Sequence, residues 1–245
     1  VVLSRGLGDV YKRQSGNSSA HICKICPIRK SKKTWTISWQ DVIRIGKYIS
    51  TKSYCFDKYV SVTGSACVEP KLLKTVSGAS LTELTAGNTN KESRLISGSA
   101  LYGTSGDSYT SYLTRYSDQV TIISDERKAN LFNWLKLGEK DHSATNVFLS
   151  SITKPERFDF DTNVNGGYRA IVPIGVFDEV NIFDIDPTLF LKSLAIGDLV
   201  ALRELGIFDL IPEDMSVFSY VCPSKYDYVA LFKDCIDDIW KEENS

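Results

Sequence analysis

The apolar residues between Trp39 and Ile49 repeat with the period of an α-helix. Val42, Ile45 and Ile49 are three or four residues apart, so a helix would place them on one face. We therefore expect an amphipathic helix over this segment.

Three serines precede an acidic residue by three positions, the spacing of a helical capping box. The pairs are Ser38 with Asp41, Ser80 with Glu83, and Ser224 with Asp227. Each pair predicts a helix start. The second helix should be one or two turns long, because Gly87 follows closely.

Four short segments read as strands. Lys58–Val62 alternates as a half-buried strand does and stops at Gly64. The other three are Leu72–Val76, Arg94–Ile96 and Gln119–Ile123. A short helix laid across a small mixed sheet is the outline of a β-grasp module, and such modules bind ligands far more often than they catalyse reactions.

The last third of the chain has a helical pattern. Asp186 is placed as an N-cap, and Pro187 stands in the first turn, where its missing N–H costs nothing. This helix should end before Gly197, a second should run over 198–205, and a third should start at Pro212. A fourth should reach Trp240 with a broad apolar stripe made by Tyr228, Leu231, Phe232, Cys235, Ile236 and Ile239. Together they predict a small antiparallel helical bundle.

Two regions are less regular. Residues 15–34 read as a strand and a loop, and residues 124–168 are loop-rich. Within the latter, 130–137 fits a short helix or a strand. Residues 1–14 resemble a translated cloning linker, so we leave them out of the fold prediction.

The cysteines and histidines do not form a recognisable catalytic or metal-binding motif. Cys23 and Cys26 have CxxC spacing, but no second ligand pair suits zinc, and the segment reads as extended rather than as the helix start of a redox dithiol. The six cysteines are expected to be reduced thiols. His21 and His142 lie near no serine or cysteine with nucleophile-elbow spacing.

Cys222-Pro223 resembles the end of a ferredoxin cluster motif. The preceding positions are Val217, Phe218 and Val221, so no cluster can be ligated there, and a structural corner before a helix is the favoured interpretation. In the same way, Asp186 is better explained as a helix cap than as a metal ligand.

Charge is unevenly distributed. Residues 1–123 hold 17 Lys+Arg against 8 Asp+Glu, and residues 124–245 hold 12 against 22, so the halves carry +9 and −10. Two domains with different surfaces explain this; the alternative is a basic half that faces an acidic partner or lipid head groups. Nucleic acid is not expected as a partner, because the basic run Arg29–Lys33 is short and has only Trp35 beside it.

Several strings, taken in order along the chain, resemble the NqrA subunits of the sodium-translocating NADH:quinone oxidoreductases (the Nqr complex). They are Trp39–Val42, Val76–Ser80 with Leu81 and Leu84, Arg94–Ser99 with Leu101 and Gly103-Thr104, Tyr168-Arg169, Ile171–Gly175, Asp186–Thr188 and Val221–Tyr226. The resemblance extends from about Ser15 to the end of the chain. Its motif positions, of structural or docking significance, include Asp186, Pro187, Cys222, Pro223, Lys225 and Tyr226.

The resemblance implies an α+β protein with three parts. Residues 15–56 would be the end of a Rossmann-like domain, whose earlier part would lie before this sequence. Residues 57–123 would be a soluble-ligand-binding β-grasp (SLBB) domain, and 124–245 a loop-rich segment with a C-terminal helical domain.

The resemblance also implies a function without catalytic residues in this chain. The complex oxidises NADH, reduces ubiquinone and exports sodium ions; its flavins and iron–sulfur centre lie on other subunits, so this chain would bind no cofactor. It would be a peripheral subunit on the cytoplasmic face of the bacterial inner membrane, docked on the membrane-embedded NqrB subunit, with ubiquinone as a further candidate ligand. The alternatives are a free-standing β-grasp module for a small ligand and an Rnf-type electron-transfer subunit, which the missing cysteines oppose.

Overall fold

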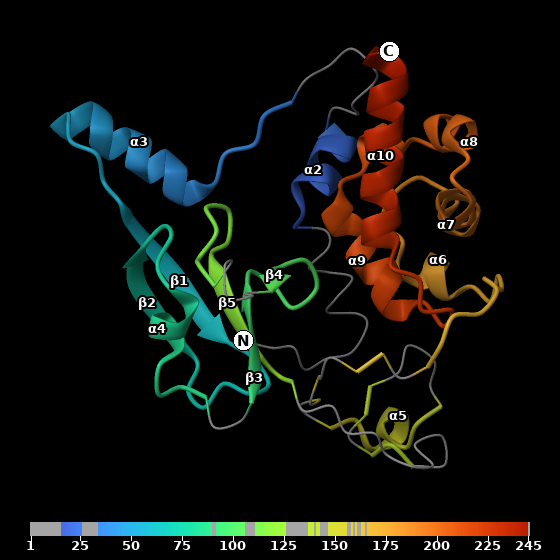
Figure 1. Cartoon of the computed structure of the whole chain (residues 1–245), viewed down its shortest axis with the longest axis horizontal. Coiled ribbons are helices and arrows are strands. Elements are labelled where there is room, and N and C mark those ends of the chain that lie inside the picture. Colours follow the sequence, from blue (N-terminus) through green and yellow to red (C-terminus); the bar gives the residue numbers. More distant parts are fainter. Residues whose placement is uncertain are drawn as a thin grey trace. The chain divides into compact units, whose positions relative to one another are not determined.

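The chain forms two compact units (Figure 1). The computed structural model describes residues 16–25, 34–89, 92–105, 111–125, 137–139, 141–142, 147–155, 158, 160, 163–164 and 166–244. The sheet unit takes the described residues from 35 to 125, with 160 and 163. The helical unit takes those from 16 to 34, from 137 to 158 and from 164 to 244.

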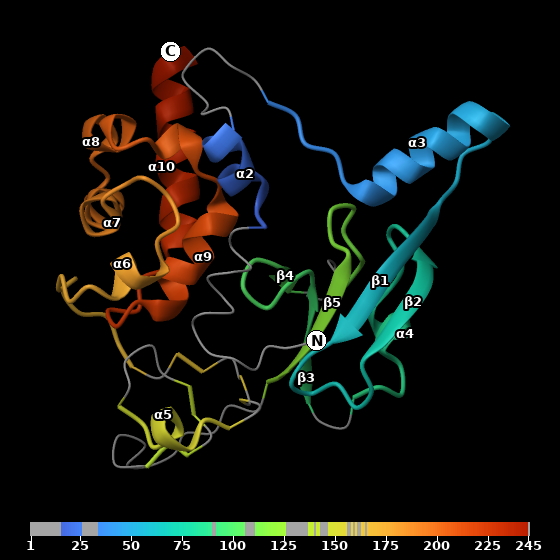
Figure 2. The same ribbon diagram turned by 180° about the vertical axis from the view of Figure 1, so that it is seen from behind.

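The sheet unit is built on one five-stranded mixed sheet, seen from both sides in Figures 1 and 2. Its strands, in the spatial order β2-β1-β5-β3-β4, are β1 (Asp57–Thr63), β2 (Lys71–Val76), β3 (Ser93–Ser97), β4 (Thr104–Ser105) and β5 (Gln119–Ser124). β1 pairs antiparallel with β2 and parallel with β5, while β3 pairs antiparallel with β5 and β4. The four strands predicted from the sequence are confirmed within one or two residues.

The core of the sheet unit lies between the sheet and the short helix α4 (Leu81–Thr85). Alternation along β1 turns Val60 and Val62 to the buried face and leaves Tyr59 exposed. The cluster of buried apolar residues is Val60, Val62, Ala66, Leu81, Leu113, Val120 and Ile122. At about 25 cal/mol per Å² of apolar surface, burial of these side chains is the main source of stability in this unit.

Gly64 ends β1, as predicted, and the reason is steric. A Cβ at this position would lie 2.0 Å from the carbonyl oxygen of Ile122, and the glycine has a φ of +138°. Only glycine allows the chain to leave β1 this close to β5.

The helical unit contains the predicted C-terminal helices. Its elements are α2 (Ser18–Ile25), α5 (Ser150–Thr153), α6 (Val176–Val180), α7 (Pro187–Ile196), α8 (Leu199–Glu204), the 3-10 helix η2 (Ile207–Asp209), α9 (Pro212–Val221) and α10 (Tyr228–Asn244). α10 packs against α9 and α7, and Figures 1 and 2 show α9 beside it in both views. The α+β class of the chain is therefore confirmed.

The predicted stripe on α10 forms the centre of this unit. Tyr228, Phe232, Cys235 and Ile239 recur at helical spacing, and all four are buried. The unit's other buried apolar residues include Phe190, Leu191, Leu194, Leu202, Ile207, Met215, Phe218 and Val221.

The prediction of a strand and a loop over 15–34 is wrong where the structure describes that range, because Ser18–Ile25 form the helix α2. Asn17 Nδ2 and Ser19 Oγ each donate a hydrogen bond of 2.8 Å to Asp214 Oδ1 on α9. The partner lies almost 200 residues away, so local pattern alone does not reveal this anchor.

The predicted capping box at Ser80 is not formed. Ser80 makes no side-chain cap, and its hydroxyl pairs with Thr82 Oγ1 at 2.7 Å. The helix α4 still begins at Leu81, as the pattern predicted, so the position of the helix start is confirmed without its cap.

The predicted capping box at Ser224 is not formed either. Ser224 donates to the carbonyl oxygen of Ala170 at 2.8 Å. α10 begins instead beside Asp227, whose Oδ1 accepts from the backbone N–H groups of Val229 and Ala230. At Ser80 and at Ser224, the hydroxyl group forms its hydrogen bond with a partner other than the backbone N–H that a capping box would use.

In the described parts of the chain, no helix is long and apolar enough to cross a bilayer. The segment predicted as helix or strand at 130–137 falls outside the described residues except for Leu137.

Candidate docking surfaces

The helix α3 (Trp39–Thr51) is attached to the start of β1 by two polar side chains. Gln40 accepts from the backbone N–H of Tyr59 and donates to its carbonyl oxygen, both at 2.9 Å. Arg44 donates to the carbonyl oxygen of Asp57 from Nε at 3.1 Å and Nη2 at 3.0 Å. The ladder between β1 and β5 begins two residues beyond Tyr59, so these side chains bond the part of β1 that precedes it.

The first turn of α3 is fixed by a charged cluster. Ser38 Oγ accepts from the backbone N–H of Asp41 at 3.1 Å, which confirms the predicted N-cap. Asp41 Oδ1 lies 2.8 Å from Arg44 Nη1 and 3.1 Å from Arg115 Nη2. The hydrogen bond from the Ser38 hydroxyl, followed by the two guanidinium groups, lowers the pKa of the Asp41 carboxyl. The N-terminal end of α3 is therefore held in one orientation.

This attachment turns the apolar side of α3 outward. Gln40 and Arg44 are buried, whereas Trp39, Ile45 and Ile49 are 61%, 50% and 62% exposed. We define the α3 face as the six exposed apolar residues Trp39, Val42, Ile43, Ile45, Tyr48 and Ile49. At 100° per residue, Trp39, Val42, Ile45 and Ile49 lie opposite Gln40 and Arg44, while Ile43 and Tyr48 flank them. An exposed apolar surface of this kind is a candidate interaction site.

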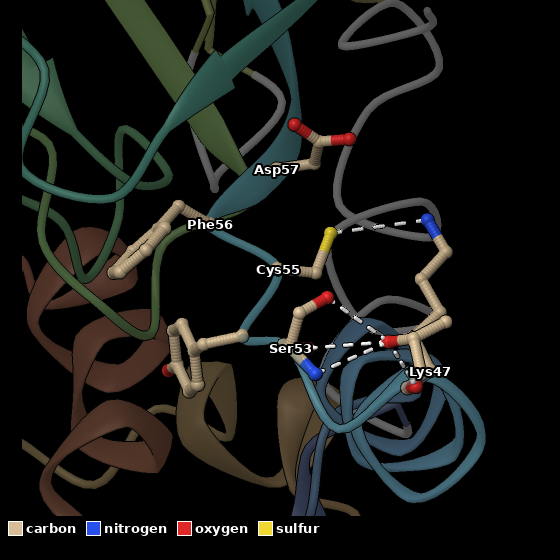
Figure 3. Close-up of a pocket in the computed structure, with 7 residues that line it drawn as sticks. Lys47, Ser53, Cys55, Phe56 and Asp57 are labelled. Carbon is tan, nitrogen blue, oxygen red and sulfur yellow. Dashed lines mark hydrogen bonds between the residues drawn. The ribbon is translucent and has the colours of Figure 1, made fainter.

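A depression of about 510 Å³ lies at the end of α3, where the chain turns into β1 (Figure 3). Its lining residues are Lys47, Thr51, Ser53, Tyr54, Cys55, Phe56 and Asp57. The Cys55 sulfur points toward the Lys47 amine, 3.8 Å away, while the Phe56 ring points to the other side. Thr51 Oγ1 donates to the Lys47 carbonyl at 2.8 Å. The contact between Lys47 and Cys55 joins the last turns of α3 to the segment that leads into β1.

The motif Cys222–Tyr226 forms a tight corner between α9 and α10. Cys222 caps α9; it is buried, and its Sγ lies 3.5 Å from the hydroxyl of Tyr228. Its carbonyl oxygen accepts from the N–H of Lys225 at 3.3 Å, and Lys225 has a φ of +62°. Pro223 is half-buried in this turn. The predicted structural corner is thus observed, and the docking significance of its residues stays a prediction.

Tyr226 connects this corner to a second depression, of about 350 Å³. Its ring stacks on Tyr228 with centroids 5.9 Å apart and meets Tyr168 edge-on at the same distance. The depression is lined by Ile171, Lys192, Ala195, Ile196 and Tyr226. Exposed apolar side chains continue around it. We define the corner surface as Tyr168, Val172, Ile174, Ile196 and Tyr226.

The six predicted motif positions do not form one site. Asp186 and Pro187 begin α7, where Asp186 Oδ1 accepts from the N–H of Leu189 at 2.9 Å and Pro187 is buried. The depression at Tyr226 uses the last turn of the same helix. Asp186 and Pro187 therefore hold α7 in shape, while Tyr226 lines the depression at its other end.

Two polar groups in the helical unit, one half-buried and one fully buried, were not anticipated from the sequence. His142 Nδ1 lies 2.5 Å from the hydroxyl of Tyr220, and Phe158 meets the imidazole edge-on at 5.0 Å. Burial lowers the pKa of His142 and raises that of Tyr220. Asp214, fully buried, accepts from Asn17 and Ser19, and burial raises its pKa. Neither group belongs to a local sequence motif that would have revealed it.

The CxxC pair gains no support as a redox or metal site. Cys23 lies in α2, two residues from its last residue, and burial, followed by the charges of Asp209, Asp184 and Asp214, raises the pKa of its thiol. A raised pKa disfavours the thiolate that redox chemistry needs. Cys26 lies outside the described residues. Among the described residues, no three His, Cys, Asp or Glu side chains cluster in a way that could hold a metal ion.

Two protein-family models match the chain. The one described as the NQRA C-terminal domain matches residues 59–107, and the one described as the NqrA second alpha/beta domain matches residues 12–54. The first covers β2, α4, β3, β4 and all but the first two residues of β1 and stops before β5, and the second ends just beyond α3.

Curated relatives match across both units. The NqrA subunit of the Na(+)-translocating NADH-quinone reductase of Neisseria meningitidis serogroup B is 39% identical over 229 residues, which is 93% of this chain and 51% of the relative. The proteins of the same name from Hahella chejuensis and Vibrio campbellii are 37% and 38% identical over the same shares. The chain thus spans about half the length of the curated relatives that it matches.

Proposed function

We propose that this chain, whose resemblance to the NqrA subunits of the Na(+)-translocating NADH-quinone reductases is confirmed by 39% identity over 93% of its length, works as part of such a subunit. The complex would oxidise NADH, reduce ubiquinone and export sodium ions. The chain would contribute by docking on other subunits and would carry out no turnover alone.

The similarity to named relatives is the observation that carries this proposal. It runs through both units rather than through one shared domain, since 229 of 245 residues align. A free-standing β-grasp module would be expected to match over the sheet unit only. An Rnf-type electron carrier would need cluster cysteines before Cys222, where Val217, Phe218 and Val221 stand.

The finer assignment of domains belongs to the same proposal. We assign residues 57–123 of the sheet unit as a β-grasp SLBB domain, supported by the parallel pairing of β1 with β5 and by the short helix α4 between β2 and β3. The helices within residues 12–54 would belong to the Rossmann-like domain, supported by the match to an alpha/beta domain there.

Exposed apolar residues in both units fit a docking role better than a catalytic one. The α3 face and the corner surface are each framed by rigid, hydrogen-bonded turns. The membrane-embedded NqrB subunit is the proposed partner, on the cytoplasmic face of the inner membrane. Ubiquinone would bind where the subunits meet.

A sedimentation experiment tests the docking proposal. Membranes that hold the complex without its NqrA subunit are mixed with this chain, extended by the part of the Neisseria meningitidis relative that lies outside the match. We expect this protein to be retained, and we expect retention to weaken with salt if charged faces contribute, since exposed charges are screened over roughly 10 Å at 0.1 M. With NADH and a soluble quinone but no membranes, it should oxidise no NADH above background.

Matched variants locate the contact. Ile174→Asp changes the corner surface, whereas Ile152→Asp on α5 changes an isoleucine that is also exposed. We expect the first to reduce retention about tenfold or more, as the loss of one interface anchor does, and the second to leave it unchanged. Equal retention on membranes that lack every subunit of the complex would contradict the proposal and favour a lipid-binding module.

A further inference from the structure

The corner surface lies among an unusual share of the basic residues of its unit. Residues 166–244 hold six Lys+Arg against fifteen Asp+Glu, yet three of the six basic residues stand at this corner. Lys192 lines the depression, and Arg169 directly follows the first residue of the corner surface. The side chain of Lys225 lies against Gly166, where a Cβ would be 3.3 Å from the lysine Cε. Positive charge is therefore gathered beside exposed apolar side chains in an otherwise acidic part of the chain.

These three basic groups have no carboxylate partner in the described part of the chain. The ion pairs of the helical unit there join Arg203 to Glu242 and Lys241 to Asp238. Both pairs involve α8 or α10 rather than the corner surface. The basic groups of the corner are therefore available to the anionic groups of a partner.

The backbone at this corner also has unused hydrogen-bonding groups. Residues 168–172 belong to no helix or strand, and their N–H groups have no acceptor among the described residues. The segment is nevertheless held at two points. Ser224 donates to the carbonyl oxygen of Ala170 at 2.8 Å, and the Ile174 N–H donates to the carbonyl oxygen of Val172 at 3.0 Å. A positioned segment with open N–H groups is what an extended peptide pairs with when it adds a strand to a protein surface.

An extended peptide fits this surface better than a lipid bilayer does. In hydrocarbon, each backbone N–H without an acceptor costs free energy, so irregular chain is not found exposed to lipid there. A peptide strand would instead supply carbonyl oxygens to the N–H groups of residues 168–172. The depression of about 350 Å³, lined mostly by apolar residues, would take one apolar side chain of that strand.

We propose that the corner surface binds an extended, acidic segment of a partner subunit. The segment pairs its backbone with residues 168–172 and places one aliphatic or aromatic side chain in the depression beside Tyr226. Its Asp or Glu side chains meet Arg169, Lys192 and Lys225. This inference rests on the proposed function, because it assumes docking on other subunits of the complex, and it adds the chemistry that the docked segment must have.

Carbodiimide crosslinking tests the charges of the proposed segment. The reagent joins a lysine amine to a carboxylate in contact with it, as an amide and with loss of one water molecule. Membranes that hold the complex without its NqrA subunit are mixed with the extended protein of the sedimentation experiment, and the products are identified by mass spectrometry. We expect Lys192 and Lys225 to be joined to Asp or Glu within one short segment of a partner subunit. Lys233 on α10 is exposed and serves as the internal control, which should not be joined to that segment.

Hydrogen exchange on the same samples tests the backbone pairing. We expect the amides of residues 168–172 to exchange about tenfold or more slowly in the docked protein than in the free protein, because strand pairing protects N–H groups. Peptides from α5 should exchange equally in both states.

A charge reversal tests the same surface without a crosslinker. Arg169→Glu places a carboxylate where the proposal needs a cation, so we expect retention on the membranes to fall about tenfold. Lys233→Glu makes the same change of charge on α10 and should leave retention unchanged.

The possible failures can be told apart. Retention without crosslinks from Lys192 and Lys225, or with unchanged exchange of residues 168–172, would overturn this inference and leave the proposed function standing, since the protein would then dock by another surface. Absence of retention would contradict the proposed function and this inference with it. Protection of residues 168–172 by phosphatidylglycerol vesicles alone would assign the surface to lipid and overturn the proposal.

The natural complex provides a second measurement if the extended protein does not fold. Exchange is then measured in the full-length relative, in its complex and after its release, at the positions aligned with residues 168–172. Slow exchange confined to the complex supports the proposal, and equally fast exchange in both states overturns it.

Discussion

Two helices of this chain have similar amphipathic patterns and opposite environments. α10 buries its stripe of Tyr228, Phe232, Cys235 and Ile239 against α7 and α9. α3 buries Gln40 and presents its apolar residues to solvent. The spacing of apolar residues thus identifies a helix and its apolar side. Whether that side is covered depends on the rest of the chain.

The two helices are also held by different forces. Burial of an apolar side chain stabilises the folded state by about 1.5–3 kcal/mol, and the stripe of α10 buries several such side chains. α3 depends on hydrogen bonds from Gln40 and Arg44, which contribute only about 0.5–1.5 kcal/mol each after exchange with water. We therefore expect α10 to unfold only with its whole unit. Detachment of α3 should cost much less free energy than unfolding that unit.

Truncation of one apolar residue on each helix should give the largest contrast. Phe232→Ala on α10 removes a ring that is 1% exposed, and we expect it to lower the free energy of unfolding of the helical unit by about 3–5 kcal/mol. Ile45→Ala on α3 removes a half-exposed side chain, and we expect a change within about 0.5 kcal/mol, since alanine is also the better helix former. Urea denaturation followed by far-UV circular dichroism measures both.

A loss above about 1.5 kcal/mol for Ile45→Ala in this chain would contradict the comparison. It would mean that the α3 face already packs on something here. Leu189→Ala, which truncates an exposed residue on α7, is the matched control within the helical unit.

Removal of one polar anchor should release α3 and leave the sheet intact. Gln40→Ala deletes both hydrogen bonds to the Tyr59 backbone and leaves its N–H and carbonyl groups unpaired. We expect a cost of about 1–3 kcal/mol, confined to the attachment of α3. Hydrogen exchange measured by mass spectrometry should accelerate in peptides from α3 and stay unchanged in peptides from β5.

Lys47→Ala is the control for this experiment, because Lys47 lies on α3 and is exposed. Equal exchange rates in Gln40→Ala and the parent chain would show that Arg44 alone suffices to hold the helix. Acceleration that spreads into β1 and β5 would show that α3 is part of the sheet unit's core.

Much of the fold could be predicted because its signals are local. The strand around Val60 alternates, Asp186 and Gly197 delimit α7 with a side-chain cap and a left-handed residue, and α10 keeps one apolar stripe. Each of these features is set by residues within one or two turns or a single strand, which is the range that sequence patterns report.

Ser80 bonds Thr82 two residues away, but the other features that the sequence did not reveal involve partners distant in sequence. α2 is anchored to Asp214, Ser224 bonds Ala170, and Gln40 bonds Tyr59, across 19 to 195 residues. A hydroxyl or amide side chain fits several partners equally well, so its choice depends on the tertiary structure. The outward direction of the α3 face follows from such a choice and could not be read from apolar spacing.

The smallest expected effect is a dependence of stability on pH in the helical unit. This unit contains α10 but not α3. Burial lowers the pKa of His142 below the unfolded value of about 6.5. The unfolded state then binds more protons, so the stability due to neutral His142 is present above pH 6.5 and is lost as the pH falls through the folded pKa. His142→Phe keeps a ring beside Phe158 and Tyr220 and removes the ionisation. We expect the difference between the urea midpoints at pH 7.5 and pH 5 to shrink in this variant.

The pKa of Asp214 is raised by burial, which is a shift of the opposite sign. The stability that protonated Asp214 contributes is fully present below the pKa of the unfolded state, about 3.9, and is lost as the pH rises through the folded pKa. Because both proteins retain Asp214, its effect cancels when the variant is compared with the parent chain. An unchanged pH difference in His142→Phe would show that the imidazole stays hydrated in the folded protein and that its contact with Tyr220 does not exclude water. The exchange of α3 peptides should have the same dependence on pH in both proteins, since His142 belongs to the helical unit and α3 is held by Gln40 and Arg44.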